Sequence, residues 1–94
     1  MINLISLQKE IIANRIRRGF PSASDLSKTT RGLEEEFLEW KQALETQNNP
    51  EMIDALGDLI VYCLGGLEIL GCDSEDVITN IVERNKNRSH KKIH

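Results

Sequence analysis

The chain has 94 residues, enough for one small domain, and a formal net charge of −3 from 12 Lys and Arg against 15 Asp and Glu. This balance provides no overall attraction to nucleic acid or to a membrane surface. The longest apolar run, residues 59–67, is far shorter than the ~20 residues that a membrane-spanning helix needs. Cys63 and Cys72 lack the spacing of a disulfide framework, so we expect reduced thiols in a cytoplasmic protein.

Two helices are predicted in the first half of the chain, over residues 2–17 and 26–47. Gly19 and Pro21 end the first helix, and a polar loop over residues 22–25 offers N-caps for the second. Both helices have a helical apolar period, and the spacing in the second, 7, 4, 3 and 4 residues, is heptad-like. The apolar positions are Leu4, Ile5, Ile11, Ile12 and Ile16, then Leu26, Leu33, Phe37, Trp40 and Leu44.

A central helix is predicted over residues 49–71, with Asn49 as N-cap, Pro50 as first helical residue and Gly71 as C-terminal glycine. The connection before it is short, so it should pack antiparallel to the preceding helix. Its apolar residues cover most of the circumference, which is typical of a buried helix. Because so short a chain cannot hide such a helix alone, we expect a homodimer or tetramer built on the apolar faces of both helices. These apolar positions are Ile53, Leu56, Leu59, Ile60, Cys63, Leu64, Leu67 and Leu70.

A fourth helix is predicted from an N-cap at Asp73 to about Asn87. The sequence contains no strand alternation, no repeat and no glycine-rich phosphate loop. The predicted fold class is therefore all-α with four helices, forming one domain over residues 1–88, and we expect the basic tail 89–94 to be frayed. The apolar positions of the last helix are Val77, Ile78, Ile81 and Val82.

Acidic residues lie on one stripe of the central helix, at Glu51, Asp54 and Asp58, and Tyr62 continues that stripe. The helix dipole accounts for acids in the first turn but not for Asp58, which lies more than two turns in. A carboxylate on a buried helix is costly unless something compensates its charge, and a divalent cation is the simplest compensation. The stripe is therefore a candidate functional site.

The second helix carries Glu35, Glu36 and Glu39, and the last two are neighbours at the i, i+3 spacing. Taken alone, such a run is most often a solvated face. Taken with the antiparallel central helix, both sets of acids lie near the packed edge, where converging carboxylates repel unless a cation lies between them. Oxygen ligands suit Mg²⁺ or Mn²⁺ rather than zinc, and the absence of a Glu-x-x-His pair argues against a di-iron bundle.

The two acidic motifs together resemble those of a known family. Glu35-Glu36-x-x-Glu39, a short spacer and then residues 54–59 are similar to the MazG-like all-α nucleoside triphosphate pyrophosphohydrolases. The double motif at this spacing is specific, whereas each half alone is weak. Further similar segments are the turn at 18–21, the connection at 70–73 and the end of the last helix at 83–88, so that the resemblance covers residues 15–88.

One position departs from the family pattern. The second motif of the family has Glu three residues before the Asp, whereas here Ala55 stands three residues before Asp58. Asp54 or Glu51 takes the place of the missing ligand, or one metal position is absent, and the sequence leaves these alternatives open.

The resemblance implies a four-helix MazG-like domain that oligomerises through a helical bundle. It also implies Mg²⁺- or Mn²⁺-dependent hydrolysis of a (deoxy)nucleoside triphosphate to the monophosphate and pyrophosphate, in nucleotide-pool house-cleaning. Phe37 and Trp40 could stack on a base, but their heptad spacing favours the core. The implied roles are metal ligation by Glu36, Glu39, Asp54 and Asp58, orientation or deprotonation of the attacking water by Glu35, and phosphate binding by Asn85, Lys86 and Arg88.

Two simpler interpretations remain beside this one. From the sequence alone, the basic end of the last helix is equally well a solvated terminus that the helix dipole favours. A catalytically silent helical dimer with the same pattern would act as an interaction or regulatory module. The basic termini could also bind nucleic acid, but Lys and Arg number 12 against 15 acids and no basic patch interleaved with aromatic residues occurs, so we expect no nucleic acid as a partner. We expect no membrane either, because the longest apolar run is too short.

Overall fold

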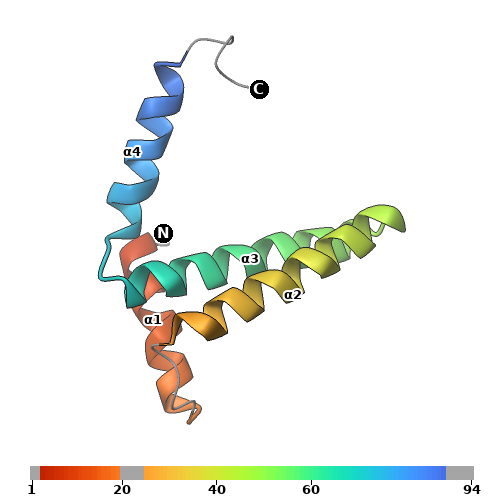
Figure 1. The fold of residues 1–94 in the computed structure, drawn as a ribbon, viewed down its shortest axis with the longest axis horizontal. Coiled ribbons are helices and arrows are strands. Elements are labelled where there is room, and N and C mark those ends of the chain that lie inside the picture. Colours follow the sequence, from red (N-terminus) through yellow and green to blue (C-terminus); the bar gives the residue numbers. More distant parts are fainter. Residues whose placement is uncertain (1–2, 20–24, 89–94) are drawn as a thin grey trace.

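The computed structural model describes residues 3–19 and 25–88 and contains four helices and no strand within them (Figure 1). The all-α prediction is confirmed. The helices α2 and α3 lie side by side as an antiparallel hairpin. The helix α1 crosses the open end of that hairpin, where α2 begins and α3 ends, and α4 projects away from it. The helices are α1 (Leu4–Arg17), α2 (Leu26–Glu45), α3 (Asn49–Ile69) and α4 (Ser74–Lys86).

Each helix begins after a side chain that caps its first backbone N–H groups. Asp73 caps α4 as predicted, because its Oδ1 accepts from the N–H of Glu75 at 2.8 Å. The prediction of Asn49 as the cap of α3 is wrong by one residue. Asn48 has extended backbone angles and accepts from the N–H of Glu51 at 3.2 Å, so Asn49 is already helical and Pro50 is the second helical residue. The other caps are Asn3 and Asp25.

The chain reverses sharply between α2 and α3. Gln47 has φ +54°, a left-handed conformation that ends α2 at Glu45, two residues before the predicted end. The N–H of Asn48 then donates to the carbonyl oxygen of Ala43 at 2.9 Å. Gly71 follows α3 with φ +75°, as expected of a glycine that ends a helix.

Small residues bring the helices close together. Ala43 of α2 and Ala55 of α3 are buried, as is Leu64 further along α3. A Cβ added to Gly66 of α3 would lie 3.2 Å from the Cγ2 of Thr29 of α2, so this glycine permits the close approach. The core of the single chain therefore lies along the α2–α3 contact and is narrow.

A buried glutamine joins α1 to the turn between α3 and α4. The Nε2 of Gln8 donates to Glu68 Oε1 at 2.9 Å and to the carbonyl oxygen of Cys72. Its Oε1 accepts from the N–H of Ser74, the first residue of α4, at 2.8 Å. Both ends of the amide are satisfied, so Gln8 fixes where α3 stops and α4 starts.

The expectation that the central helix is buried is not met within a single chain. Only Ala55, Leu64, Gly65 and Gly66 of α3 are buried, while the side of the helix that carries Ile53, at 69% exposure, is open. The helix α4 is bent by 112° from α3 and contacts α1 and α3 but not α2 within the described residues. Exposed apolar residues of α2, α3 and α4 include Phe37, Leu38, Leu44, Leu56, Ile60, Val61, Ile78, Ile81 and Val82.

Within the described ranges, no single helix is both long and apolar enough to cross a membrane, and α3 and α4 pass such a test only together, as a bent pair.

Candidate active site

Three acidic side chains lie near one another where the middle of α2 packs on α3. Glu36 of α2 is half-buried, and its Oε1 is buried without a hydrogen-bond partner among the described residues. Burial first, and then the negative charges of Asp58 and Glu39, raise the pKa of the Glu36 carboxyl. Hydrogen bonds to Asp58 and Glu39, which only a protonated Glu36 can donate, raise this pKa further. Asp58 therefore lies across the helix contact from Glu36, as the spacing of the two motifs predicts. The cluster favours a proton or a cation.

The donor set of this cluster consists of carboxylate oxygens, which suits a hard cation such as Mg²⁺. The orphaned Oε1 of Glu36 is a buried acceptor that such a cation would satisfy. As the side chains lie, no group of three or more Asp, Glu, His or Cys residues in the described ranges is close enough to hold a metal ion. The carboxylates of Glu36, Glu39 and Asp58 are neighbours, but they do not converge on a single point as they lie.

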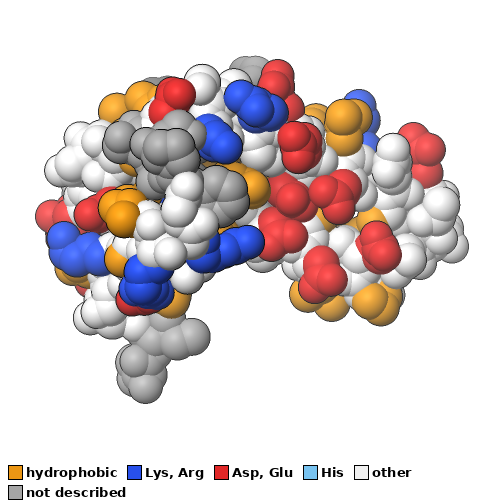
Figure 2. All heavy atoms as spheres, turned by 90° about the horizontal axis from the view of Figure 1, so that it is seen from below, with side chains coloured by type: hydrophobic (Ala, Val, Ile, Leu, Met, Phe, Trp, Pro, Cys, Tyr) orange, Lys and Arg blue, Asp and Glu red, His pale blue; other side chains and the backbone are white. Residues whose placement is uncertain are grey.

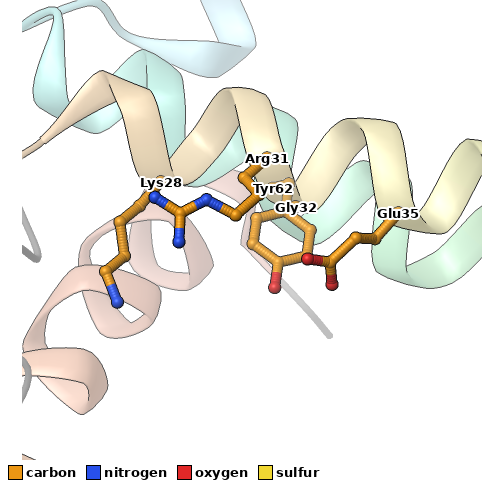
Figure 3. A pocket seen from close by; sticks show the side chains of 5 residues that line it. All are labelled: Lys28, Arg31, Gly32, Glu35 and Tyr62. Carbon is orange, nitrogen blue, oxygen red and sulfur yellow. The ribbon is translucent and has the colours of Figure 1, made fainter.

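A basic pocket lies on the α2–α3 hairpin one turn further toward α1. It encloses about 160 Å³ and contains Glu35, directly before Glu36 in α2 (Figure 3). Figure 3 shows the Glu35 carboxylate and the Tyr62 hydroxyl pointing to the same side, with Lys28 and Arg31 of α2 on the opposite side of Tyr62 from Glu35. The lining residues are Lys28, Arg31, Gly32, Glu35 and Tyr62.

Tyr62 is held by a glycine of the opposite helix. A Cβ on Gly32 would lie 2.2 Å from the Cε1 of Tyr62, so the ring packs directly on the backbone of α2. From α1, the guanidinium of Arg15 lies over the same ring, 5.4 Å from its centroid, and against Gly65 of α3. The pocket is thus lined by α2 and α3, and Arg15 of α1 adds positive charge from outside the lining.

The comparisons with known proteins identify the family. The family model of the MazG nucleotide pyrophosphohydrolase domain matches residues 25–93, well over half of the chain. The chain belongs to the MazG family. No curated protein and no solved structure matches it. The match includes α2, α3 and α4, and with them both acidic motifs, so the resemblance drawn from those motifs is confirmed.

The departure of this MazG domain at Ala55 has a clear place in the structure. Ala55 is 2% exposed and therefore faces the interior of the helix hairpin, where a longer side chain would reach toward α2. Asp54, one residue earlier, is exposed, and so is Glu51 near the start of α3. The structure records no contact between Asp54 and Glu36, and a ligand role for Asp54 stays a prediction.

The phosphate-binding residues predicted on α4 lie apart from the acids of the same chain. Asn85, Lys86 and Arg88 are exposed, and the Nζ of Lys86 lies 3.5 Å from the Oε1 of Glu83. Because α4 has no contact with α2 in the described part of the MazG domain, a single chain does not bring these residues to the acid cluster. Their role stays a prediction, and so does the role of Glu35.

Several residues of the pocket were missed by sequence reasoning. Nothing in the sequence distinguishes Arg31 and Lys28 of the pocket, or Arg15 beside it, from other basic residues. Only the rotation of one helix against another places them near Tyr62. Gly32 inside a predicted helix was the one available signal, because such a glycine costs helix stability and commonly marks a close approach. The expectation of Phe37 in the core is not met within this chain, since it is 53% exposed with Lys41 over its ring.

Proposed function

We propose that the protein is a Mg²⁺-dependent nucleoside triphosphate pyrophosphohydrolase. It hydrolyses a (deoxy)nucleoside triphosphate to the monophosphate and pyrophosphate, in nucleotide-pool house-cleaning. The observation that carries this proposal is the orphaned, buried carboxylate oxygen of Glu36 beside Asp58 and Glu39, in a chain that matches the nucleotide pyrophosphohydrolase domain.

Glu36, Glu39 and Asp58 would hold the cation, with Asp54 as a further direct or water-mediated contact. Mg²⁺ supplies neutralisation of the negative charge on the phosphate oxygens, and Mn²⁺ has the same ligand preference. The cluster supports this assignment because it is acidic, partly buried and incompletely hydrogen-bonded. Removing one acid from the metal-free protein would relieve repulsion and leave the helices in place.

Glu35 is the residue that we assign to the attacking water. It lies next to Glu36 in the sequence, is exposed, and lines the pocket beside the acid cluster. In the proposed reaction, the water oxygen forms a bond to the α-phosphorus while the bond from that phosphorus to the oxygen bridging it to the β-phosphorus breaks. Glu35 accepts the proton of the water, and pyrophosphate leaves with the bridging oxygen.

The proposed active form is a homodimer or tetramer. The support is the apolar surface that one chain leaves open on its two longest helices: Ile53 and Ile60 of α3 are 69% and 57% exposed, and Phe37 and Leu38 of α2 are 53% and 56% exposed. A second copy packed on this surface would complete a helical bundle with α2 and α3. Sedimentation at micromolar concentration should show a dimer or tetramer, and a monomer would contradict this part of the proposal.

The experiment that tests the function is a screen of the pure protein against canonical and modified (deoxy)nucleoside triphosphates, with pyrophosphate release as the readout. We expect turnover of at least one nucleotide with Mg²⁺ and none when the metal is chelated. If no nucleotide is hydrolysed in either condition, the proposal is wrong. The exposed apolar surface would then favour a catalytically silent module that binds another protein and is indifferent to Mg²⁺.

A further inference from the structure

We propose that the pocket of Lys28, Arg31, Gly32, Glu35 and Tyr62 binds a diphosphate group. Before the reaction this group is the β- and γ-phosphates of the substrate, and after it the pyrophosphate product. The assignment to the leaving group rests on the proposed function. The pocket itself is recognised by its own chemistry, namely two cations and a hydroxyl around a hollow of about 160 Å³.

The position of the pocket relative to the acid cluster fits the two ends of a triphosphate. Arg31 and Glu36 are five residues apart on α2, about 7.5 Å along the helix axis. On α3, Tyr62 follows Asp58 by one turn, so both helices carry cluster acids and pocket residues in adjacent turns. Figure 2 shows acidic side chains gathered over the hairpin, next to basic side chains on the side nearer α1. A phosphate chain whose reacting end lies at the acids therefore extends toward Arg31 and Lys28.

The pocket is poorly suited to a nucleobase. The ring of Tyr62 packs on the backbone of Gly32 and has the Arg15 guanidinium over one face, so a base stacking on that face would have to displace Arg15. The hydroxyl of Tyr62 remains on the pocket side, where Figure 3 shows it beside the Glu35 carboxylate. The hollow is also smaller than the ~300 Å³ at which sites for whole drug-sized ligands begin.

The cations of the pocket are suited to phosphate oxygens. Arg31 presents a planar group that can bind two oxygens at once, and Lys28 one turn away adds a mobile point charge. Arg15, held over Tyr62 from α1, adds positive charge without entering the lining. The carboxylate of Glu35 closes the side toward the acid cluster, so an anion in the pocket is held at the Arg31 and Lys28 side.

The test uses inorganic pyrophosphate as the probe. Calorimetry of the pure protein with pyrophosphate and Mg²⁺ should show binding that Arg31→Ala weakens about tenfold or more, with a smaller loss for Lys28→Ala and partial retention in Arg31→Lys. Lys41→Ala is the matched control, because it removes a cation of the same helix that lies over Phe37 instead of in the pocket. Circular dichroism would verify that each variant is folded. Inhibition by the nucleoside monophosphate should not change in Arg31→Ala.

Two results would overturn the inference: pyrophosphate binding that Arg31→Ala leaves unchanged, or an equal loss in Lys41→Ala. A loss in Lys86→Ala with none in Arg31→Ala would move the diphosphate site to α4 and equally refute it. The test is independent of turnover. If no nucleotide is hydrolysed but Arg31→Ala abolishes pyrophosphate binding, the proposed function fails and the anion site stands. If nucleotides are hydrolysed and Arg31→Ala binds pyrophosphate normally, only the inference fails.

Discussion

Two polar side chains that bury oxygen atoms, Gln8 and Glu36, have opposite environments. Gln8, 4% exposed, uses both ends of its amide in hydrogen bonds to Glu68, Cys72 and Ser74. Glu36 buries a carboxylate oxygen that has no partner in the described ranges, and its pKa is raised by burial and by two neighbouring acids. Burying a polar group without a hydrogen bond is costly in both places. The fold meets that cost internally at Gln8, which is structural. The hydroxyls of Thr29 and Ser74 are also buried without a partner among the described residues, but of these groups Glu36 alone is an acid with two acidic neighbours, and there we expect a ligand.

Removing an acid of the cluster around Glu36 should have the largest effect on function. Asp58→Asn or Glu39→Ala should reduce the kcat/KM of Mg²⁺-dependent hydrolysis by about 100-fold or more, because a lost ligand removes several kcal/mol of charge stabilisation. The measurement is pyrophosphate release, with a thermal melt to verify the fold. Glu34→Gln, an exposed acid of the same run, serves as the control and should behave like the parent. Unchanged turnover in Asp58→Asn would show that the acids are not the site.

Removing the structural amide should affect stability instead of chemistry. Gln8→Ala deletes three hydrogen bonds and leaves the N–H of buried Ser74 without its acceptor. We expect a loss of about 2–3 kcal/mol in the free energy of unfolding, measured in urea. The exposed Gln42→Ala is the matched control and should be within about 0.5 kcal/mol of the parent. A loss of activity in folded Gln8→Ala protein would show that Gln8 has a functional role and not only a structural one.

A third variant probes the packing that holds the pocket. Gly32→Ala would place a methyl group 2.2 Å from a carbon of the Tyr62 ring, so the ring must move or α2 must shift. We expect a destabilisation of about 1–3 kcal/mol. Gly57→Ala is the matched control, because nothing lies within 4 Å of the added methyl group, and a helical glycine replaced by alanine should gain up to ~1 kcal/mol. Equal stability of the two variants would mean that Tyr62 does not pack on Gly32 in solution.

The raised pKa of Glu36 has a defined consequence for pH dependence. The folded-state pKa of this carboxyl lies above its usual value of 4.5, so the folded protein binds the proton more tightly than the unfolded chain. The resulting stabilisation is fully present below pH 4.5 and is lost as the pH rises through the folded-state pKa. Above the folded-state pKa, the metal-free protein carries the unfavourable charge, and Glu36→Gln should be the more stable protein there. The difference between variant and parent should shrink as the pH falls toward 4.5. Urea unfolding of both proteins across this range would measure it, and a constant difference would contradict the assignment.

Much of the fold could be predicted from the sequence because it depends on local features. Caps such as Asp73, the glycine at position 71 and the helical apolar periods act over one or two turns, so the existence and approximate ends of all four helices were predictable. The i, i+3 spacing of Glu36 and Glu39 likewise fixes their shared face. Features that depend on how one helix rotates against another were not predictable. The contact of Tyr62 with Gly32 and the placement of Arg15 over that ring belong to this second kind.

What covers the apolar surface of the central helix was not predictable for a related reason, and its coverage by a second copy stays a prediction. An apolar residue in a helical pattern indicates that its side chain is covered in the folded protein, but it does not indicate whether the same chain or a second chain covers it. Ile53 and Ile60 of α3 are open in the single chain, although the helical wheel places them on a covered face. The same limit applies to α4, whose exposed Ile78, Ile81 and Val82 lie away from α2. Intermolecular packing is therefore the part of the fold that a helical wheel cannot assign.

The smallest expected effect concerns the position where this chain departs from its family. Ala55 faces the interior of the hairpin at 2% exposure, whereas Asp54, about 100° around the helix, is exposed. Asp54 lies one turn before Asp58, and we expect it to support the cation directly or through water, with a weaker effect than the cluster acids. Asp54→Asn should therefore weaken Mg²⁺ affinity and turnover by about tenfold, the scale of a supporting metal contact. Glu51→Gln, nearer the helix start, should change little. Both substitutions are nearly isosteric, so calorimetry of Mg²⁺ and pyrophosphate release compare charge alone. Equal affinity and activity in Asp54→Asn and the parent would leave a site built from Glu36, Glu39 and Asp58, with one metal position of the family absent.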